Sequence, residues 1–338
     1  MTLADDARSG LAARPDVAHR GDDGFAGTVI RVLGSGIELL PAAPGRVLLR
    51  VQAGHGWDAL VAQSVAAGYA GLEALSGIPG SVGAAPVQNI GAYGRELGHV
   101  LAAVDVFDLG TGEVVRRPAA DLGLGYRTSV FKRGDRAVIV AVLFDLAVSA
   151  EGDVAYPQLA GALGVETGAR LPAADIRAAV LRLRAAKGML LDEDDPDTWS
   201  AGSFFTNPLV SEHVARALPA EAPRWRVRPD DAAVAVTPLE ELAAGGPVRL
   251  PPTEDPASPA AAVKLSAAWL IEHAGIGRGF RLPGARAAIS SKHTLALTNR
   301  GGASAEEIAQ LARYVQVRVL AEFGVQLEPE PVLVGIEL

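Results

Sequence analysis

The 338-residue sequence predicts an α+β fold with more than one domain. Strand-like and helix-like runs are mixed along the chain without a regular strand–helix–strand repeat, a pattern that favours α+β over a parallel α/β sheet. The composition, 49% hydrophobic and 21% charged, is ordinary for a globular protein. A chain of this length is sufficient for two or three domains, each with its own core.

The first half of the chain contains the main predicted strands. The runs that predict them are residues 46–54, 100–109, 112–117 and 137–148. Gly110 and Thr111 separate the second and third runs, which indicates a hairpin. Between the first two runs we expect a helix over 58–68, with Asp58 capping its start and Gly68 ending it.

The second half contains three predicted helices. The first spans about 173–187, and Gly188 stops it. The second lies in "KLSAAWLIEHAG" with Ser266 as its cap, and the third follows a capping box formed by Ser304 and Glu307 and ends at Phe323-Gly324. The predicted apolar faces of the first and third helices are Ile176, Ala179, Val180 and Leu183, and Ile308, Leu311, Val315, Val319 and Leu320. The last run, "PVLVGIEL", predicts a strand.

Composition argues against several classes of partner. The net charge of −8 disfavours nucleic acid, which requires a clustered positive field. The chain has no cysteine, and its six histidines never fall four residues apart, so we expect no metal site. The longest apolar run, 137–148, is too short to cross a membrane and contains Asp145, so we expect no membrane insertion.

A glycine-rich segment at 77–94, "GIPGSVGAAPVQNIGAYG", is the first candidate for a binding site. It matches neither a Walker loop nor a dinucleotide-binding glycine motif. Glycines let the backbone come close to a ligand and present N–H groups, which suits phosphates or a flat heterocycle. The alternative is a glycine-rich turn with a purely structural role.

Three further stretches contain side chains that suit catalysis. Arg127 in "GYRTSVFK" is either a fork-shaped donor for a carboxylate or phosphate, or a surface ion pair. Ser203 in "AGSFFTNP" is either a proton donor desolvated by the aromatic residues after it, or a cap. In "LEPEP", Glu328 and Glu330 project to the same side of an extended backbone, either toward a site or as an edge protected by charge and proline.

Together and in order, these stretches resemble the UDP-N-acetylenolpyruvoylglucosamine reductases. The matching pieces are "GLEALSGIPGSVGAAPVQNIGAYG", "LGYRTSVFK", "VIVAV", "AGSFFTNP", "VKLSAAWLIE" and "LEPEP". "VAYPQL", which contains Tyr156, is similar to the substrate loop of the family's first subclass. The resemblance implies an FAD-binding fold of the vanillyl-alcohol oxidase type with a C-terminal substrate-binding domain.

The resemblance also implies domain boundaries. We expect a remnant of the first FAD lobe at 1–36, the second FAD lobe at 37–188 and the substrate domain at 189–328. The substrate domain would carry a loop-rich insertion at 219–262, and a C-terminal strand at 329–338 would return near the flavin lobes.

The activity implied is the NADPH-dependent, FAD-mediated reduction of UDP-N-acetylglucosamine enolpyruvate to UDP-N-acetylmuramate, a peptidoglycan precursor. Ser203 matches the proton donor, and Arg127 and Glu330 match the residues that polarise the substrate carboxylate. We expect a cytoplasmic monomer. The implied sugar-nucleotide contacts are Tyr156, Lys187, Asn207 and Lys264. The implied FAD contacts are Gly77, Ile78, Pro79, Gly80, Ser81, Gly83, Gln88, Asn89, Gly91, Ala92, Tyr93 and Gly94.

The start of the chain departs from the family pattern. The family opens with a "T-x-x-x-G-G" stretch and a "GGGSN"-like loop for the flavin pyrophosphate, and "LADDARSGLAARPDVAHRG" matches neither. We therefore expect most of the first flavin lobe to be missing and FAD to bind weakly. Two alternatives stay open: a flavin-deficient homologue that binds UDP-sugar without turnover, and another flavin oxidoreductase of the same fold.

Overall fold

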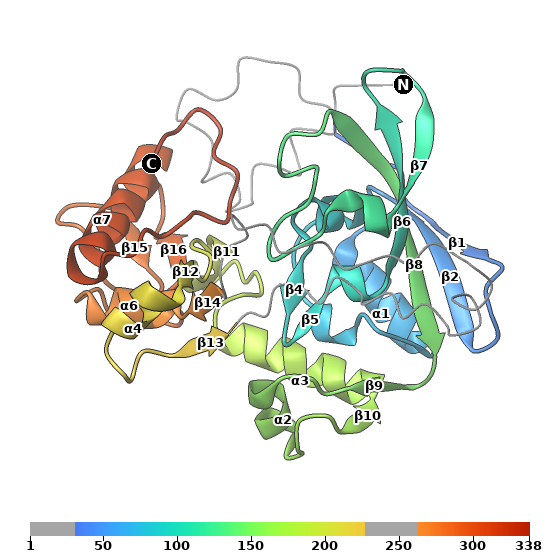
Figure 1. Cartoon of the computed structure of the whole chain (residues 1–338), viewed down its shortest axis with the longest axis horizontal. Helices are drawn as coiled ribbons and strands as arrows, with labels where there is room; N and C mark the ends of the chain where they lie inside the picture. Colours follow the sequence, from blue (N-terminus) through green and yellow to red (C-terminus); the bar gives the residue numbers. More distant parts are fainter. Residues whose placement is uncertain (1–30, 227–261) are drawn as a thin grey trace, which may run out of the picture. The chain divides into compact units, whose positions relative to one another are not determined.

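The computed structural model describes residues 31–226 and 262–338. The described chain divides into an N-terminal unit that extends to Ser200 and a C-terminal unit that starts at Ala201 (Figure 1). The division lies after Ser200, whereas the sequence analysis placed the boundary between the second FAD lobe and the substrate domain after residue 188. Most of the expected flavin-lobe remnant (1–36) and of the expected insertion (219–262) lies outside the described residues.

An antiparallel sheet forms the centre of the N-terminal unit, in the order β1-β2-β8-β6-β7, with β3 also paired to β8. The strands are β1 (Ile37–Leu40), β2 (Arg46–Gln52), β3 (Tyr69–Ala70), β6 (Leu101–Asp108), β7 (Val114–Pro118) and β8 (Ala137–Val148). Val47, Leu49 and Val51 alternate inward along β2, as expected for a strand with one face on a core. The four predicted strands and the β6–β7 hairpin are confirmed.

Helix α1 (Trp57–Ala66) begins one residue earlier than predicted, and Gly56 occupies its N-cap position. The prediction that Asp58 caps this helix is wrong. Its carboxylate instead accepts hydrogen bonds from the backbone N–H of Gly77 at 2.6 Å and from Arg177 at 2.6 and 2.7 Å. Gly68 ends the helical turn with φ +75°, as predicted.

A smaller core in the N-terminal unit surrounds α3 (Ala173–Ala186). It includes α2 (Pro157–Leu163), which packs against α3, and the antiparallel pair of β9 (Glu151–Asp153) and β10 (Arg170–Pro172), which flanks α2 in the sequence (Figure 1). The predicted apolar face of α3 is confirmed, with Ile176, Ala179 and Val180 buried and Leu183 packed against them. Arg184 is also buried on α3, which the apolar pattern did not predict.

The remaining elements of the N-terminal unit are short. β4 (Gly91–Ala92) and β5 (Arg95–Glu96) pair with each other. The 3₁₀ helices among the described residues of this unit are Glu73–Leu75, Val82–Gln88, Leu97–His99, Ala119–Leu122 and Pro196–Thr198. Two of these lie in or directly before the glycine-rich segment, which therefore consists of turns, the 3₁₀ helix Val82–Gln88 and the short strand β4.

Within its described residues, the C-terminal unit contains two three-stranded sheets and the helices α4, α6 and α7. One sheet has the order β11-β16-β15 and the other β12-β14-β13. The strands are β11 (Ser200–Ser203), β12 (Leu209–Ser211), β13 (Arg224–Arg226), β14 (Ala262–Leu265), β15 (Ala287–Ile289) and β16 (Ala296–Asn299). The helices are α4 (Glu212–Ala217), α6 (Ala267–His273) and α7 (Ala305–Phe323).

The predicted caps of α6 and α7 are confirmed. Ser266 accepts from the N–H of Trp269 at 3.2 Å. Ser304 and Glu307 cap α7 reciprocally, at 3.1 and 2.9 Å. Leu320 is 45% exposed, so its placement on the apolar face of α7 is wrong. Because successive residues of a helix point about 100° apart, Leu320 points away from the core when its neighbour Val319 points into it.

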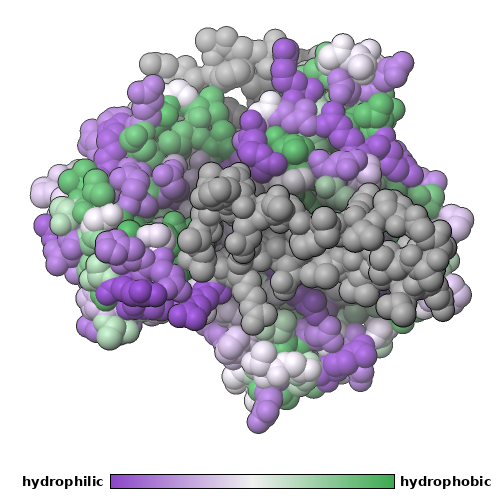
Figure 2. All heavy atoms as spheres, in the orientation of Figure 1, coloured by the Kyte–Doolittle hydropathy of each residue, from purple (hydrophilic) through white to green (hydrophobic). Residues whose placement is uncertain are grey.

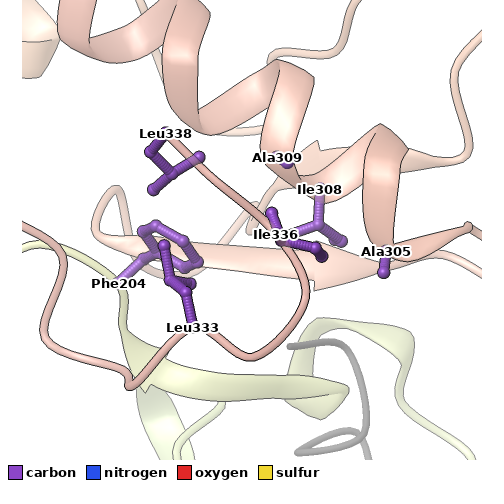
Figure 3. Close-up of a pocket in the computed structure, with 7 residues that line it drawn as sticks. All are labelled: Phe204, Ala305, Ile308, Ala309, Leu333, Ile336 and Leu338. Carbon is purple, nitrogen blue, oxygen red and sulfur yellow. The ribbon is translucent and has the colours of Figure 1, made fainter. Parts of the chain in front are cut away.

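The C-terminal segment does not form the predicted strand, since an isolated bridge at Val334 is the only β-type pairing described within residues 331–338. Its apolar side chains instead line a small cavity of about 10 Å³ with Phe204 and helix α7 (Figure 3). The residues of this cavity are Phe204, Ala305, Ile308, Ala309, Leu333, Ile336 and Leu338. The structure groups residues 329–338 with the C-terminal unit, where we had expected a strand returning to the flavin lobes.

Candidate active site

The glycine-rich segment packs directly against the end of β2. The N–H of Gly83 donates to the carbonyl of Ala53 at 2.8 Å, and a Cβ at Gly83 would lie 2.5 Å from the Cβ of Ala53. Gly80 has φ +115°, a backbone conformation that side chains rarely adopt. A Cβ there would meet nothing within 4 Å, so the missing side chain leaves the backbone open to a ligand.

Arg127 lies against this segment, although 36 residues separate it from Gly91. Its Nη2 donates to the carbonyl of Gly91 at 2.7 Å, and a Cβ at Gly91 would lie 2.9 Å from Nη1. Ser129 donates to the carbonyl of Val87 at 2.6 Å. The structure therefore brings together two of the stretches that the sequence selected separately. Arg127 itself has φ +53°, an uncommon conformation for a residue with a side chain.

Asn89 holds the segment in shape through its side chain. Its amide donates to Glu96 at 3.0 Å and to the carbonyl of Gly125 at 3.1 Å, and its oxygen accepts from the N–H of Gly98 at 2.9 Å. The residue is buried and has φ +45°. Both donors and the acceptor of the side chain are thus used within the protein, and Asn89 acts on a ligand only by positioning the backbone around it.

Two residues predicted to contact the sugar nucleotide lie near Tyr93 in the N-terminal unit. The ring of Tyr156 meets the ring of Tyr93 edge-on at 6.1 Å, and Nζ of Lys187 lies 6.0 Å from the centre of the Tyr93 ring. Burial lowers the pKa of Lys187, and the charge of Arg184 lowers it further. Burial raises the pKa of Tyr93. Tyr93, Tyr156 and Lys187, which are far apart in sequence, are therefore one cluster.

Ser203 and the backbone of Glu330 lie on adjoining chain segments of the C-terminal unit. Phe205 and Pro329 form an antiparallel bridge, and the N–H of Glu330 donates to the carbonyl of Phe204 at 2.8 Å. Phe204 and Phe205 are buried in the core, while Ser203 stays half-buried. The structure thus brings the two predicted residues onto one pair of extended segments.

His293 is a neighbour of Ser203 that the sequence analysis missed. Its Nε2 lies 3.2 Å from the Ser203 hydroxyl oxygen, across 90 residues of chain. It precedes β16, whose partner in the sheet is β11, the strand that ends at Ser203. The sequence carries no local signal for this contact, because only the sheet pairing places the two residues together.

The other two predicted nucleotide contacts lie in the C-terminal unit. The side-chain oxygen of Asn207 accepts from the N–H of Ala267 at 3.0 Å, at the start of α6. Lys264 is in β14, opposite Leu209 of β12. The predicted catalytic and nucleotide-binding residues therefore belong to different units. The N-terminal unit contains Arg127, Tyr156 and Lys187, and the C-terminal unit contains Ser203, Glu330, Asn207 and Lys264.

Comparison with known proteins identifies the family. A model of an FAD binding domain matches residues 18–117, and a model of the UDP-N-acetylenolpyruvoylglucosamine reductase C-terminal domain matches residues 194–334. The reductase of Leifsonia xyli is 56% identical over 94% of this chain and 85% of its own length. The chain belongs to the UDP-N-acetylenolpyruvoylglucosamine reductase family.

Other members of this family match over similar lengths. The reductase of Saccharopolyspora erythraea is 47% identical over 100% of this chain and 89% of its own length. A crystal structure of the reductase from Thermus caldophilus matches at 25% identity with a TM-score of 0.50, over 84% of this chain and 72% of that chain. The predicted α+β fold, an FAD-binding domain followed by the C-terminal domain of this reductase family, is confirmed.

The match to the FAD-binding model also bears on the expected loss of the first flavin lobe. It begins at residue 18, within the region where we expected the lobe to be missing, so the comparison does not support that expectation. Residues 1–30 lie outside the described residues.

The residues of the N-terminal unit fit an FAD group. The backbone at Gly80 is open on its Cβ side, as a closely bound nucleotide requires. Beside the segment, Nε of Arg184 is buried and has no hydrogen-bond partner among the described residues, which suits a ligand that carries anionic oxygens. The surface displayed in Figure 2 mixes hydrophilic and hydrophobic residues, and within the described ranges no helix is long and apolar enough to cross a membrane. Nor do the described Asp, Glu and His residues gather into a group that could hold a metal ion.

Proposed function

We propose that this chain reduces UDP-N-acetylglucosamine enolpyruvate to UDP-N-acetylmuramate for peptidoglycan synthesis. The observation that carries the proposal is the placement of the Ser203 hydroxyl beside His293, on a segment bridged to the one that bears Glu330. Membership of the reductase family supplies the substrate class.

The proposed catalytic residues each have one task. When bound, FAD supplies the hydride that it takes from NADPH. Addition of hydride to an enol ether places negative charge on the adjacent carboxylate, and Arg127 stabilises that charge through its guanidinium. Glu330 shares a proton with the same carboxylate. Ser203 donates the proton that completes the reduced lactyl group, in a site from which water is excluded.

The proposed binding residues also have separate tasks. Lys187 and Lys264 provide positive charge for the diphosphate, and Tyr156 and Asn207 provide hydrogen-bonding groups. The glycine-rich segment holds FAD through backbone contacts. The side chain of Asn89 keeps this backbone in position through its hydrogen bonds within the protein. NADPH as the reductant, a monomeric state and a cytoplasmic location complete the proposal. They are supported by the family membership.

Turnover with matched substrates tests this proposal. The purified chain, supplied with FAD, is mixed with NADPH and either the enolpyruvyl sugar nucleotide or UDP-N-acetylglucosamine, and NADPH oxidation is followed. We expect oxidation coupled stoichiometrically to UDP-N-acetylmuramate with the first compound and no coupled product with the second. Binding of both compounds without turnover would instead indicate a sugar-nucleotide-binding homologue, and oxidation that ignores the enolpyruvyl group would indicate another flavin oxidoreductase.

A further inference from the structure

Arg184 is a buried cation of the N-terminal unit whose charge has no adjacent acidic partner. The residue is 9% exposed, and its Nη2 donates to the carbonyl of Met189 at 3.3 Å. Its Nε is buried and finds no hydrogen-bond partner in the part of the chain that the structure describes. Burial lowers the pKa of Arg184, although an arginine stays charged under all ordinary conditions. A buried charge without a partner is strongly unfavourable unless something else compensates it.

The carboxylate that acts on Arg184 from a distance is already occupied. Asp58 attracts Arg184 electrostatically, but both of its oxygens bind Arg177, at 2.6 and 2.7 Å. Asp58 and Arg177 therefore neutralise each other. Within residues 31–226 and 262–338, this leaves the charge of Arg184 without a carboxylate of its own.

A second cation increases the positive charge at the same place. Lys187 lies one turn further along the chain and is half-buried. Its Nζ donates to the neutral side chain of Gln158 at 2.9 Å, and the charge of Arg184 lowers its pKa. Two uncompensated positive charges repel each other here, which is the condition that an anionic ligand relieves.

The position of Arg184 places this charge at the glycine-rich segment. A Cβ at Gly77 would lie 3.2 Å from Nε of Arg184, so the guanidinium lies against the backbone of that glycine. Tyr93, at the other end of the segment, lies beside Lys187, with Nζ 6.0 Å from the centre of its ring. The cation is therefore next to the groups that we assign to FAD and to the sugar nucleotide.

We propose that Arg184 binds an anionic oxygen of a nucleotide ligand, with Lys187 as the second positive charge of the same site. The chemistry required is a phosphate-like or similarly anionic acceptor, which the planar guanidinium recognises with directed hydrogen bonds. FAD and the UDP-sugar are the two candidate ligands that carry such an oxygen, and this choice of candidates rests on the proposed function.

Binding measurements on Arg184→Met, with Arg182→Met as a control, test this inference. Arg182 is an exposed arginine on the same helix. FAD affinity is measured by flavin fluorescence on flavin-depleted protein, and UDP-N-acetylglucosamine affinity by calorimetry on FAD-loaded protein. Loss of a charge-assisted hydrogen bond should weaken one of the two ligands by at least about tenfold. The control should stay within about twofold of the wild type, because an exposed charge contributes little.

The outcomes separate the two sources and a purely structural role. Weaker FAD binding assigns Arg184 to the flavin nucleotide, and weaker UDP-sugar binding alone assigns it to the substrate. Unchanged affinity for both ligands overturns the inference. In ligand-free protein we expect Arg184→Met to melt no lower than the wild type, because a buried uncompensated charge is removed. A lower melting temperature with unchanged affinities indicates a structural role.

A second variant covers the case in which Arg184→Met does not fold. Arg184→Lys keeps the positive charge and loses the planar fork, so we expect at least about threefold weaker binding of the same ligand. Wild-type affinity of Arg184→Lys for both ligands would then overturn the inference. Because these are binding measurements, a chain that fails to turn over the enolpyruvyl substrate refutes the proposed function without deciding the role of Arg184.

Discussion

The hydroxyl oxygen of Ser203 lies 3.2 Å from Nε2 of His293. A serine hydroxyl is a very weak acid in water, and once it has given up a proton it carries a charge that must be stabilised or neutralised. The imidazole is within hydrogen-bonding distance of the oxygen on which this charge would form. We therefore expect Ser203 and His293 to act on the same step of the reaction.

Ser203→Ala should separate the two halves of the proposed reaction. Reduction of the flavin by NADPH does not use Ser203 and should keep its rate to within about twofold. Reoxidation by the enolpyruvyl substrate should slow by at least about 100-fold, the usual contribution of a positioned general acid. Anaerobic stopped-flow measurement of flavin absorbance resolves both steps. If both fell together, Ser203 would have a structural role.

Replacement of His293 should affect the same step more weakly. His293→Phe removes the partner of the Ser203 hydroxyl, and the loss of one hydrogen bond should slow the second half-reaction by about tenfold. His293→Gln, which retains a hydrogen-bonding side chain, should restore part of the rate. Equal rates for the wild type and the Phe variant would show that the contact is not used in catalysis.

Gly83→Ala should destabilise the glycine-rich segment. The added Cβ would lie 2.5 Å from Cβ of Ala53 and 3.1 Å from its Cα, so strand β2 and the segment must move apart. We expect a loss of about 1–3 kcal/mol in the free energy of unfolding, together with weaker FAD binding. Thermal and denaturant unfolding measure the first effect, and flavin fluorescence measures the second.

Gly161→Ala is the matched control for that substitution. Gly161 lies within α2, and a Cβ there would meet nothing within 4 Å. Alanine favours the helix over glycine, so the variant should be unchanged or more stable by up to about 1 kcal/mol. A similar loss of stability in both variants would contradict the proposed close packing at Gly83.

Asp105 should make the free energy of unfolding depend on pH. Burial raises the pKa of this carboxyl, but hydrogen bonds from Arg116 at 2.7 Å and Arg50 at 2.7 Å outweigh that effect and hold the pKa below its ordinary value. A carboxyl whose pKa is lowered by folding stabilises the fold at pH values above its unfolded-state pKa of about 4. This contribution is lost as the pH falls below that value and through the lower pKa of the folded state.

Asp105→Asn therefore should cost about 2 kcal/mol of unfolding free energy at neutral pH, where the buried carboxylate is ionised and paired. The difference from the wild type should shrink as the pH is lowered below about 4. Urea unfolding at a series of pH values measures it. A difference that stays constant from neutral to acid pH would show that the charge of Asp105 contributes nothing.

Local sequence signals predicted the regular elements well. Strand alternation in β2, the hairpin between β6 and β7, the Ser266 cap of α6 and the capping box of α7 are set by residues within a few positions of each other. The same is true of the motifs that placed Ser203, Arg127 and the glycine-rich segment in one family. Prediction failed at the C-terminal segment, where an apolar run suited to a strand packs its side chains near α7 instead.

By itself, the sequence determined the α+β fold, the main strands and capped helices, the family and its FAD domain. Only the tertiary structure decided that Asp58 binds Arg177, that His293 approaches Ser203 and that Arg184 is buried with a free Nε. The physical reason is distance along the chain. Turns, caps and strand alternation depend on neighbouring residues, whereas contacts across 119 or 90 residues exist only after the sheets and helices have packed.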